Sequence, residues 1–121
     1  MSLAIELEGV RQMDKSVLRN LLELCHHDYS EFNQADVDEH GLYGYIYLDN
    51  YWTEPGRYAF FIKVGGKLAG FVMVRAMGDN MHTIAEFFVL RKYRHRGVGQ
   101  IAAQRIFSIL KRAQNPVAMN P

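Results

Sequence analysis

Residues 86–103, with the sequence EFFVLRKYRHRGVGQIAA, contain the residue types from which a phosphate-binding loop is built. Four cationic side chains fall within six residues: Arg91, Lys92, Arg94 and Arg96. Gly97 and Gly99 follow, and glycine lets a phosphate approach the backbone closely because it has no side chain. A helix that begins at these glycines offers free N–H groups and a dipole that favour an anion. The segment therefore predicts a pyrophosphate cradle at the start of a helix.

The glycine spacing separates this loop from two common nucleotide-binding loops. No Lys-Ser or Lys-Thr pair follows the glycines, as a Walker A loop requires. A dinucleotide fingerprint needs a third glycine and an earlier strand–helix–strand unit, and neither is found here. The arginines and Tyr93 also fit a nucleic-acid contact, but the acidic first half of the chain would repel a phosphate backbone. We therefore expect no nucleic-acid partner.

The elements around this loop are predicted from hydrophobic periodicity and turn residues. Strands are predicted over residues 57–64, 67–76 and 81–90, and the glycine pair at 65–66 makes the first two a hairpin. Residues 97–113 are predicted as a helix because their apolar side chains recur on one face. The loop thus lies between a strand and an amphipathic helix.

The first half of the chain supplies a further strand and helix. Residues 3–10 alternate as a strand does, and residues 15–27 form an amphipathic helix that Asp14 is expected to cap. The polar, acidic residues 28–44 are predicted to be a loop with a short helix. The order of strand, helix, linker, three antiparallel strands and helix predicts a mixed α/β fold.

Composition and charge bound the function classes. The chain has 121 residues, which we expect to form one domain over residues 1–121, and its single cysteine excludes an internal disulfide. No apolar run is long enough for a spanning helix and no secretory signal is visible, so a cytoplasmic protein without a membrane partner is expected. Residues 1–56 carry three basic and eleven acidic side chains, whereas residues 57–121 carry eleven basic and two acidic ones. The split predicts two surfaces of opposite potential or simply a balanced domain.

The order Arg94-x-x-Gly97-x-Gly99 resembles the acetyl-CoA-binding motif of the GNAT N-acetyltransferases, (Q/R)-x-x-G-x-(G/A). The strand before the motif and the helix after it are similar to that family as well. The resemblance covers residues 3 to about 112. It implies a GNAT-like acyl-CoA N-acyltransferase fold, with a mixed, largely antiparallel sheet flanked by helices. It also implies acetyl-CoA as the co-substrate and a primary amine as the acceptor.

The same resemblance implies roles for individual residues. Backbone N–H groups at the cradle would hold the pyrophosphate, and the strand over residues 87–90 would hydrogen-bond to the pantetheine arm. The backbone N–H near Val89 would polarise the thioester carbonyl in an oxyanion-type role. The residues expected to bind the co-substrate are Phe88, Val89, Leu90, Arg94, Arg96, Gly97, Val98 and Gly99.

Glu86 is the expected general base, because the attacking amine must lose a proton and many family members use a glutamate in this strand. It is the only acidic residue between Asp79 and the end of the chain. The alternative is an ordinary outward-facing residue paired with an arginine, and both interpretations stay open. His82 lies four residues earlier in the predicted strand, so we expect it to face the same side as Glu86.

Other candidate residues have simpler explanations. The acidic residues 28–39 would attract an amine acceptor or form a solvated loop. Cys25-His26-His27 and the pattern Asp36-x-Asp38-x-His40 match no zinc or EF-hand spacing, so no metal site is predicted, and Cys25 is expected to act as a small hydrophobic residue. Four aromatic residues are candidates for an acceptor pocket or for the core: Tyr45, Tyr47, Tyr51 and Trp52.

Family members usually continue past the motif helix with further strands and a helix, whereas only residues 114–121 follow the predicted helix here. We therefore expect either a shortened domain or a homodimer in which a second copy covers the edge of residues 87–90. A second function stays open beside acetyl transfer, namely a non-catalytic GNAT-like module that binds CoA or a protein partner.

Overall fold

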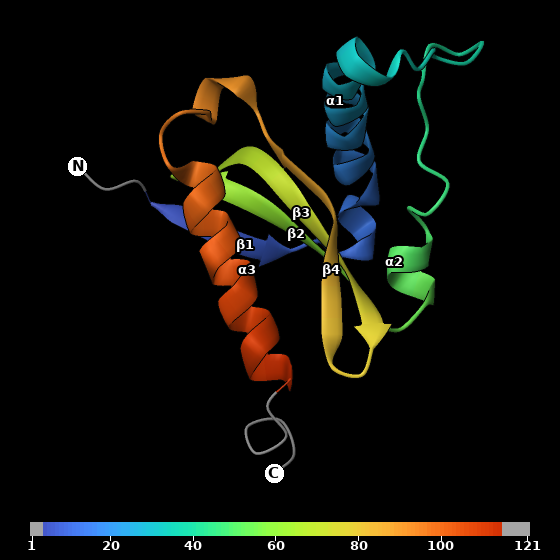
Figure 1. Ribbon diagram of the computed structural model, residues 1–121. Coiled ribbons are helices and arrows are strands. Elements are labelled where there is room, and N and C mark those ends of the chain that lie inside the picture. The colour runs from blue at the N-terminus through green and yellow to red at the C-terminus, as the bar shows by residue number, and fades with distance from the viewer. Residues whose placement is uncertain (1–3, 115–121) are drawn as a thin grey trace.

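The computed structural model of the protein describes residues 4–114 and contains one antiparallel sheet with a long helix on each face (Figure 1). Its strands are β1 (Ile5–Gly9), β2 (Arg57–Val64), β3 (Lys67–Gly78) and β4 (Met81–Val89), and they follow one another in the order β1-β2-β3-β4. The helices are α1 (Lys15–Asn33), α2 (Asn50–Thr53) and α3 (Val98–Gln114), with short 3-10 turns η1 (Gln12–Asp14) and η2 (Arg91–Tyr93). Within this described part, no helix is both long and apolar enough to cross a membrane.

The alternation of apolar side chains along the strands creates a separate core on each face of the sheet. In β3, Phe71 and Met73 face α1, whereas Val72 and Val74 face α3. The α1 core includes the apolar stripe of that helix, and the α3 core includes the stripe of its own. The buried helix residues are Leu18, Leu21, Leu22 and Cys25 in α1, and Val98, Ala102, Ile106 and Leu110 in α3. The predicted mixed α/β order and both predicted helix faces are confirmed.

Helix α1 begins at Lys15 as predicted, but its end and its capping differ from the prediction. It continues to Asn33 instead of ending near residue 27, and it ends where Gln34 takes a left-handed conformation with φ 60°. No glycine or proline interrupts residues 28–33, so nothing breaks the helix although the apolar stripe has ended. Asp14 precedes the helix but makes no side-chain capping bond, because its carboxylate accepts a hydrogen bond of 3.0 Å from Arg11 Nε instead.

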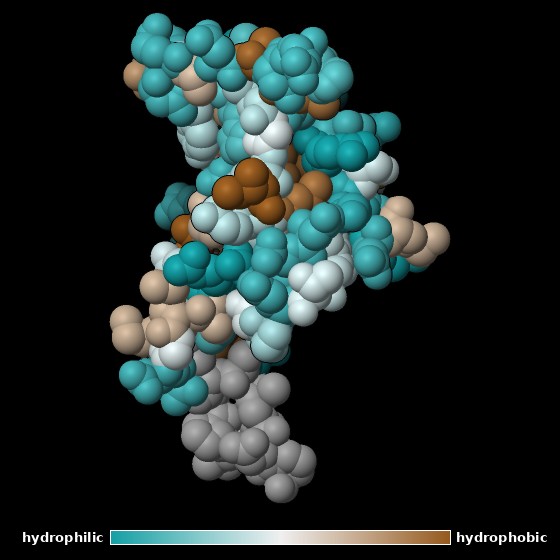
Figure 2. Space-filling model, turned by 90° about the vertical axis from the view of Figure 1, so that its right-hand side faces the viewer, coloured by the Kyte–Doolittle hydropathy of each residue, from teal (hydrophilic) through white to brown (hydrophobic). Residues whose placement is uncertain are grey.

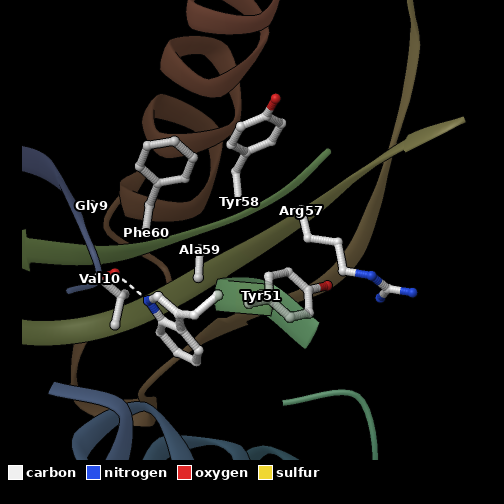
Figure 3. A pocket seen from close by; sticks show the side chains of 8 residues that line it. Gly9, Val10, Tyr51, Arg57, Tyr58, Ala59 and Phe60 are labelled. Atoms are coloured by element: carbon white, nitrogen blue, oxygen red, sulfur yellow. Dashed lines mark hydrogen bonds between the residues drawn. The ribbon is translucent and has the colours of Figure 1, made fainter. Parts of the chain in front are cut away.

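A β-bulge in β4 reverses the expected relation between His82 and Glu86. Met73 pairs with Glu86 and Val74 pairs with Ile84, so Ala85 is an extra residue without a partner across the ladder. The extra residue turns the Glu86 side chain toward α1. The side chain of Ile84, two residues earlier, packs against the α3 core. The His82 ring accordingly lies 6.2 Å from the ring of Tyr58, which projects with Phe60 from the side of β2 opposite to Ala59 (Figure 3). The prediction that His82 and Glu86 share one face is wrong.

Candidate functional site

The predicted phosphate loop lies between β4 and α3. The Tyr93 ring is buried in the α3 core and anchors the loop, and His95 and Gly97 have positive φ values of 63° and 76°. The first hydrogen bond of α3 runs from the Ile101 N–H to the Gly97 carbonyl at 3.0 Å. The amides of Val98 and the next two residues precede it, so they have no carbonyl acceptor inside the helix.

The two glycines leave the backbone of this loop accessible. A Cβ at Gly97 would meet no atom within 4 Å, and a Cβ at Gly99 would lie 3.7 Å from side-chain atoms of Phe87 and Val89. Gly97 is therefore required by its backbone conformation and not by crowding, because L-residues rarely adopt a φ of this sign. The side chain of Arg96 is exposed beside this backbone. Helix amides, glycines and a cation together form a cradle that fits a pyrophosphate.

Arg94 is fixed by partners on two elements. Its Nε donates to the Val89 carbonyl at 2.7 Å, and its Nη2 donates to Asp28 Oδ2 on α1 at 2.6 Å. Arg91 Nη2 donates to the other oxygen of the same carboxylate at 2.9 Å. These guanidinium groups, Arg94 first, hold the pKa of the Asp28 carboxyl below its usual range. Two of the four predicted loop cations are thus bound by a carboxylate that the sequence analysis assigned to a polar loop.

The outer edge of β4 carries backbone groups that face away from the sheet. Among residues 4–114, β4 is an edge strand, and the Leu90 N–H donates to the Ala69 carbonyl at 2.7 Å. Because backbone groups alternate along a strand, the N–H and C=O of Val89 turn to the opposite, outer edge. The Arg94 bond to the Val89 carbonyl and the Tyr29 hydroxyl, 3.5 Å from the Phe87 carbonyl, lie on this edge.

Phe88 and Leu90 differ from Val89 in what they offer. Their backbone amides face β3, so only their side chains are available to a ligand at the end of β4. Both line an open cavity of about 450 Å³ between α1 and this end of β4. The other lining residues are Leu24, His27, Asp28, Arg91 and Lys92. Of Phe88, Val89 and Leu90, Val89 alone has a backbone N–H directed to the outer edge.

Glu86 is paired with a histidine and not with an arginine. Its Oε1 lies 3.2 Å from His26 Nε2 on α1, and the two side chains are only 17% and 18% exposed. The hydrogen bond to Glu86 is the main cause that raises the pKa of His26, and burial opposes it. Both residues line a cavity of about 330 Å³, together with Tyr29, Asn33, Ala35, Asp36 and Tyr43. Sequence reasoning considered His26 only as a metal ligand and missed this pair.

The loop after α1 encloses His26. The two carboxylate oxygens of Glu23 accept hydrogen bonds of 2.8 Å from the backbone N–H groups of Tyr43 and Gly44. The ring of Tyr43 lies 6.4 Å from the His26 ring in an edge-on arrangement, and the ring of Tyr45 lies 5.8 Å from it. Tyr45 is thus the one of the four predicted aromatic residues whose ring contacts the Glu86 pair.

The remaining aromatic candidates lie elsewhere. Tyr51 and Trp52 line a groove of about 230 Å³ beside β1 and β2, in which Trp52 Nε1 donates to the Val10 carbonyl at 3.2 Å (Figure 3). Tyr51 is buried in the α1 core, and Tyr47 is about half exposed. The face that carries α2 shows apolar side chains in the middle of a largely hydrophilic surface (Figure 2). Tyr47, Tyr51 and Trp52 therefore do not line the cavity beside Glu86.

The last two sequence candidates are Cys25 and the possible metal ligands. Cys25 is fully buried in the α1 core, and burial raises the pKa of its thiol to about 12, so it stays protonated at neutral pH. Within residues 4–114, no three side chains of His, Cys, Asp or Glu are grouped as metal ligands would be.

The chain matches one family by its sequence, and solved acetyltransferases share its fold. The model of the acetyltransferase (GNAT) family matches residues 18–117. A GNAT-family acetyltransferase from Staphylococcus aureus is 18% identical with a TM-score of 0.65, over 89% of this chain and 67% of that one. An acetyltransferase from Vibrio fischeri is 21% identical with a TM-score of 0.62, over 88% and 86%. An aminoglycoside acetyltransferase from an uncultured soil metagenomic sample, in complex with sisomicin, is 13% identical with a TM-score of 0.65, over 91% and 72%. The search of curated proteins gave no significant match.

Proposed function

Because the chain belongs to the GNAT acetyltransferase family, we propose that it transfers an acetyl group from acetyl-CoA to a primary amine. The observation that carries the proposal is that two sets of backbone N–H donors lie close together in the sequence. The Val89 N–H, at the end of β4, points outward, and the free amides of α3 begin eight to ten residues later, at Gly97 to Gly99. A thioester and the pyrophosphate joined to it need hydrogen-bond donors at two such places on one path.

Val89 and residues 96–99 would bind acetyl-CoA along that path. The N–H groups of Arg96, Gly97, Val98 and Gly99 would hold the pyrophosphate, with the exposed Arg96 side chain adding positive charge. The Val89 N–H would donate to the thioester oxygen as negative charge develops there. Arg94 has a different part, because its bonds to Asp28 and Val89 make it a residue that positions the loop.

The transfer itself would take place between Val89 and Glu86. The amine nitrogen attacks the thioester carbonyl carbon, a C–N bond forms and the C–S bond breaks, and Glu86 takes up the proton that the amine loses. The cavity beside Glu86 would admit the acceptor, and its carboxylates and tyrosines suit a cationic amine. The acceptor would thus approach Glu86 beside α1, whereas the cradle lies at the start of α3.

Calorimetric titration of acetyl-CoA at low and moderate salt tests the cradle. We expect binding that weakens as salt increases, and that weakens at least tenfold in Gly97→Gln. Gly78→Gln is the matched control, because Gly78 also has a φ of about 80° and open space at its Cβ but is the last residue of β3. Equal losses in both variants would overturn the cradle.

An amine screen tests the transfer. Wild type and Glu86→Gln are assayed with acetyl-CoA and four acceptors: spermidine, lysine, tyramine and a peptide with a free N-terminal alanine. We expect turnover of at least one amine by wild type, and a loss of turnover with unchanged acetyl-CoA affinity in Glu86→Gln. Acetyl-CoA binding without turnover of any amine by wild type would instead favour the non-catalytic module.

A further inference from the structure

His26 forms a largely buried pair with the carboxylate of Glu86. Its Nε2 lies 3.2 Å from Glu86 Oε1 on β4. Glu86 is the main cause that raises the pKa of His26, and the backbone of Gly44 acts in the same direction. An imidazolium has an N–H donor at both ring nitrogens, so Nε2 can donate to Glu86 while Nδ1 keeps a second donor.

Glu23 fixes the backbone of Gly44. It stands three residues before His26 on α1, and its carboxylate binds the N–H groups of Tyr43 and Gly44 at 2.8 Å each. These two bonds tie the loop to the helix and keep the Gly44 backbone against the imidazole. The negative charge of Glu23 also favours the imidazolium. Glu23, Gly44, His26 and Glu86 therefore form one connected chain from α1 through the loop to β4.

We propose that His26 and Glu86 work as one acid–base unit, in which Glu86 takes the proton of the attacking amine and passes it to His26 Nε2. The proposal rests on the proposed acetyl transfer and adds His26 and Glu23 to it as positioning residues. The N–H bond of the amine breaks as its nitrogen bonds to the carbonyl carbon, and the CoA sulfur leaves as a thiolate that solvent protonates. At the end Glu86 is again a carboxylate and His26 is an imidazolium.

The pair is a better proton acceptor than Glu86 alone. An isolated carboxylate of ordinary pKa, about 4, binds a proton from an amine only weakly at neutral pH. An imidazole beside a carboxylate gains its proton at a pH closer to neutrality, and the Glu86 bond raises the pKa of His26 further in that direction. His26 therefore holds the proton after transfer and can also release it to solvent after each turnover.

The other groups around His26 do not compete for this proton. Tyr29 from α1 and Tyr45 from the loop stay protonated at neutral pH, because burial raises the pKa of both, that of Tyr29 to about 12. The remaining charged neighbours are Glu86 from β4, Glu23 from α1 and Asp36, which lines the same cavity. Of these carboxylates, Glu86 and Glu23 favour the imidazolium by attraction. His26 is therefore the group of this cavity that changes charge near neutral pH.

The first test follows the protonation of His26 by NMR and requires no turnover. The His26 resonance is assigned by its loss in His26→Gln, and its midpoint is measured in wild type, Glu86→Gln and Glu23→Gln. We expect a wild-type midpoint above the ordinary value of about 6.5. It should fall markedly in Glu86→Gln and by a smaller amount in Glu23→Gln, whereas His40→Gln, at an exposed position of the loop after α1, should leave it unchanged. An unchanged midpoint in Glu86→Gln would overturn the unit, whatever the enzyme acetylates.

The second test follows kcat/KM against pH, using the amine that reacts fastest in the screen above. We expect the wild-type rate to rise with pH as His26 loses its proton, with a midpoint equal to the NMR value. In His26→Gln this limb should disappear and kcat should fall about 10- to 100-fold, with the KM for acetyl-CoA unchanged. A His26→Gln profile that keeps the wild-type limb would show that His26 only supports the fold. Thermal unfolding of each variant confirms that it is folded, and His40→Gln is again the control.

Discussion

Arg94 Nη2 lies 2.6 Å from Asp28 Oδ2, which joins the loop before α3 to a turn of α1 that is 66 residues away in the sequence. The same guanidinium donates from Nε to the Val89 carbonyl at 2.7 Å. The guanidinium is planar and has N–H donors on two sides, so it makes both bonds at once. A lysine ammonium is a compact charge and is less suited to both bonds. The position of the β4 edge is therefore coupled to α1 through one arginine.

The first prediction concerns the Asp28 carboxylate. Its folded-state pKa is lowered, mainly by Arg94, so the bonds stabilise the protein above the unfolded pKa of about 4 and are lost as pH falls through the folded pKa. We expect Asp28→Asn to lower the free energy of unfolding by about 1 to 2 kcal/mol at pH 7. Urea unfolding between pH 3 and pH 7 should show this difference closing in acid. Asp36→Asn, at an exposed carboxylate, should change little, and a difference that persists at pH 3 would contradict the ion-pair explanation.

The second prediction separates the two glycines of the loop. Gly97 has a φ of 76° and Gly99 lies in the first turn of α3, where a Cβ makes ordinary contacts. We expect Gly97→Ala to lower stability by about 1 kcal/mol, because an L-residue is strained in the left-handed region. Gly99→Ala should leave stability unchanged or raise it by about 0.5 kcal/mol, since alanine favours a helix. Equal effects in chemical unfolding would show that Gly97 does not keep this backbone conformation in solution.

A third prediction concerns the close approach of β3 to β4. A Cβ at Gly70 would fall on the Phe88 carbonyl oxygen and lie 3.0 Å from Val89 Cα, so the backbone of β4 would have to shift. We expect Gly70→Ala to cost about 3 kcal/mol and to lower affinity for acetyl-CoA, because the Val89 N–H moves with the strand. Gly9→Ala on β1 is the control, since a Cβ there meets nothing within 4 Å. Thermal unfolding and calorimetry of both variants provide the comparison, and a stable Gly70→Ala with normal binding would argue against this packing.

Most of the sheet was predictable because its signals are local. Two runs rich in apolar and aromatic residues, joined by a glycine pair, mark β2 and β3, and the structure has β2 at the predicted bounds of residues 57–64. The last turns of α1 were missed because Asp28 and Tyr29 do not extend its apolar stripe. Contacts with Arg91, Arg94 and Phe87, all distant in sequence, support those turns instead. Hydrophobic periodicity indicates only which side chains are buried in a core, so it does not indicate these long-range contacts.

The candidate site was predictable only in part, for a similar reason. The loop from Arg94 to Gly99 is contiguous, so its spacing could be read directly. The pairing of His26 with Glu86 joins residues that are 60 positions apart, and the bulge at Ala85 that turns Glu86 toward α1 has no glycine to mark it. A count of alternation along β4 therefore gave the wrong face for His82. No sequence signal we know of would have found this pair.

The fourth prediction uses pH to measure the His26–Glu86 bond through stability. The folded-state pKa of His26 is raised, so the bond contributes fully below the unfolded pKa of about 6.5 and is lost as pH rises through the folded pKa. We expect Glu86→Gln to lower the free energy of unfolding by about 1 to 2 kcal/mol at pH 6, because the bond joins two charged, largely buried groups. The difference should shrink steadily toward pH 8.5 in a series of urea unfolding curves.

Glu31→Gln, at an exposed position near the end of α1, should show no such trend. A gap between wild type and Glu86→Gln that stays constant from pH 6 to pH 8.5 would mean that Glu86 acts by packing alone. A gap that closes at the pH where the His26 resonance titrates would tie stability and proton uptake to the same imidazole. Because neither measurement involves acetyl-CoA, that agreement would hold for the folded chain before any acceptor is identified.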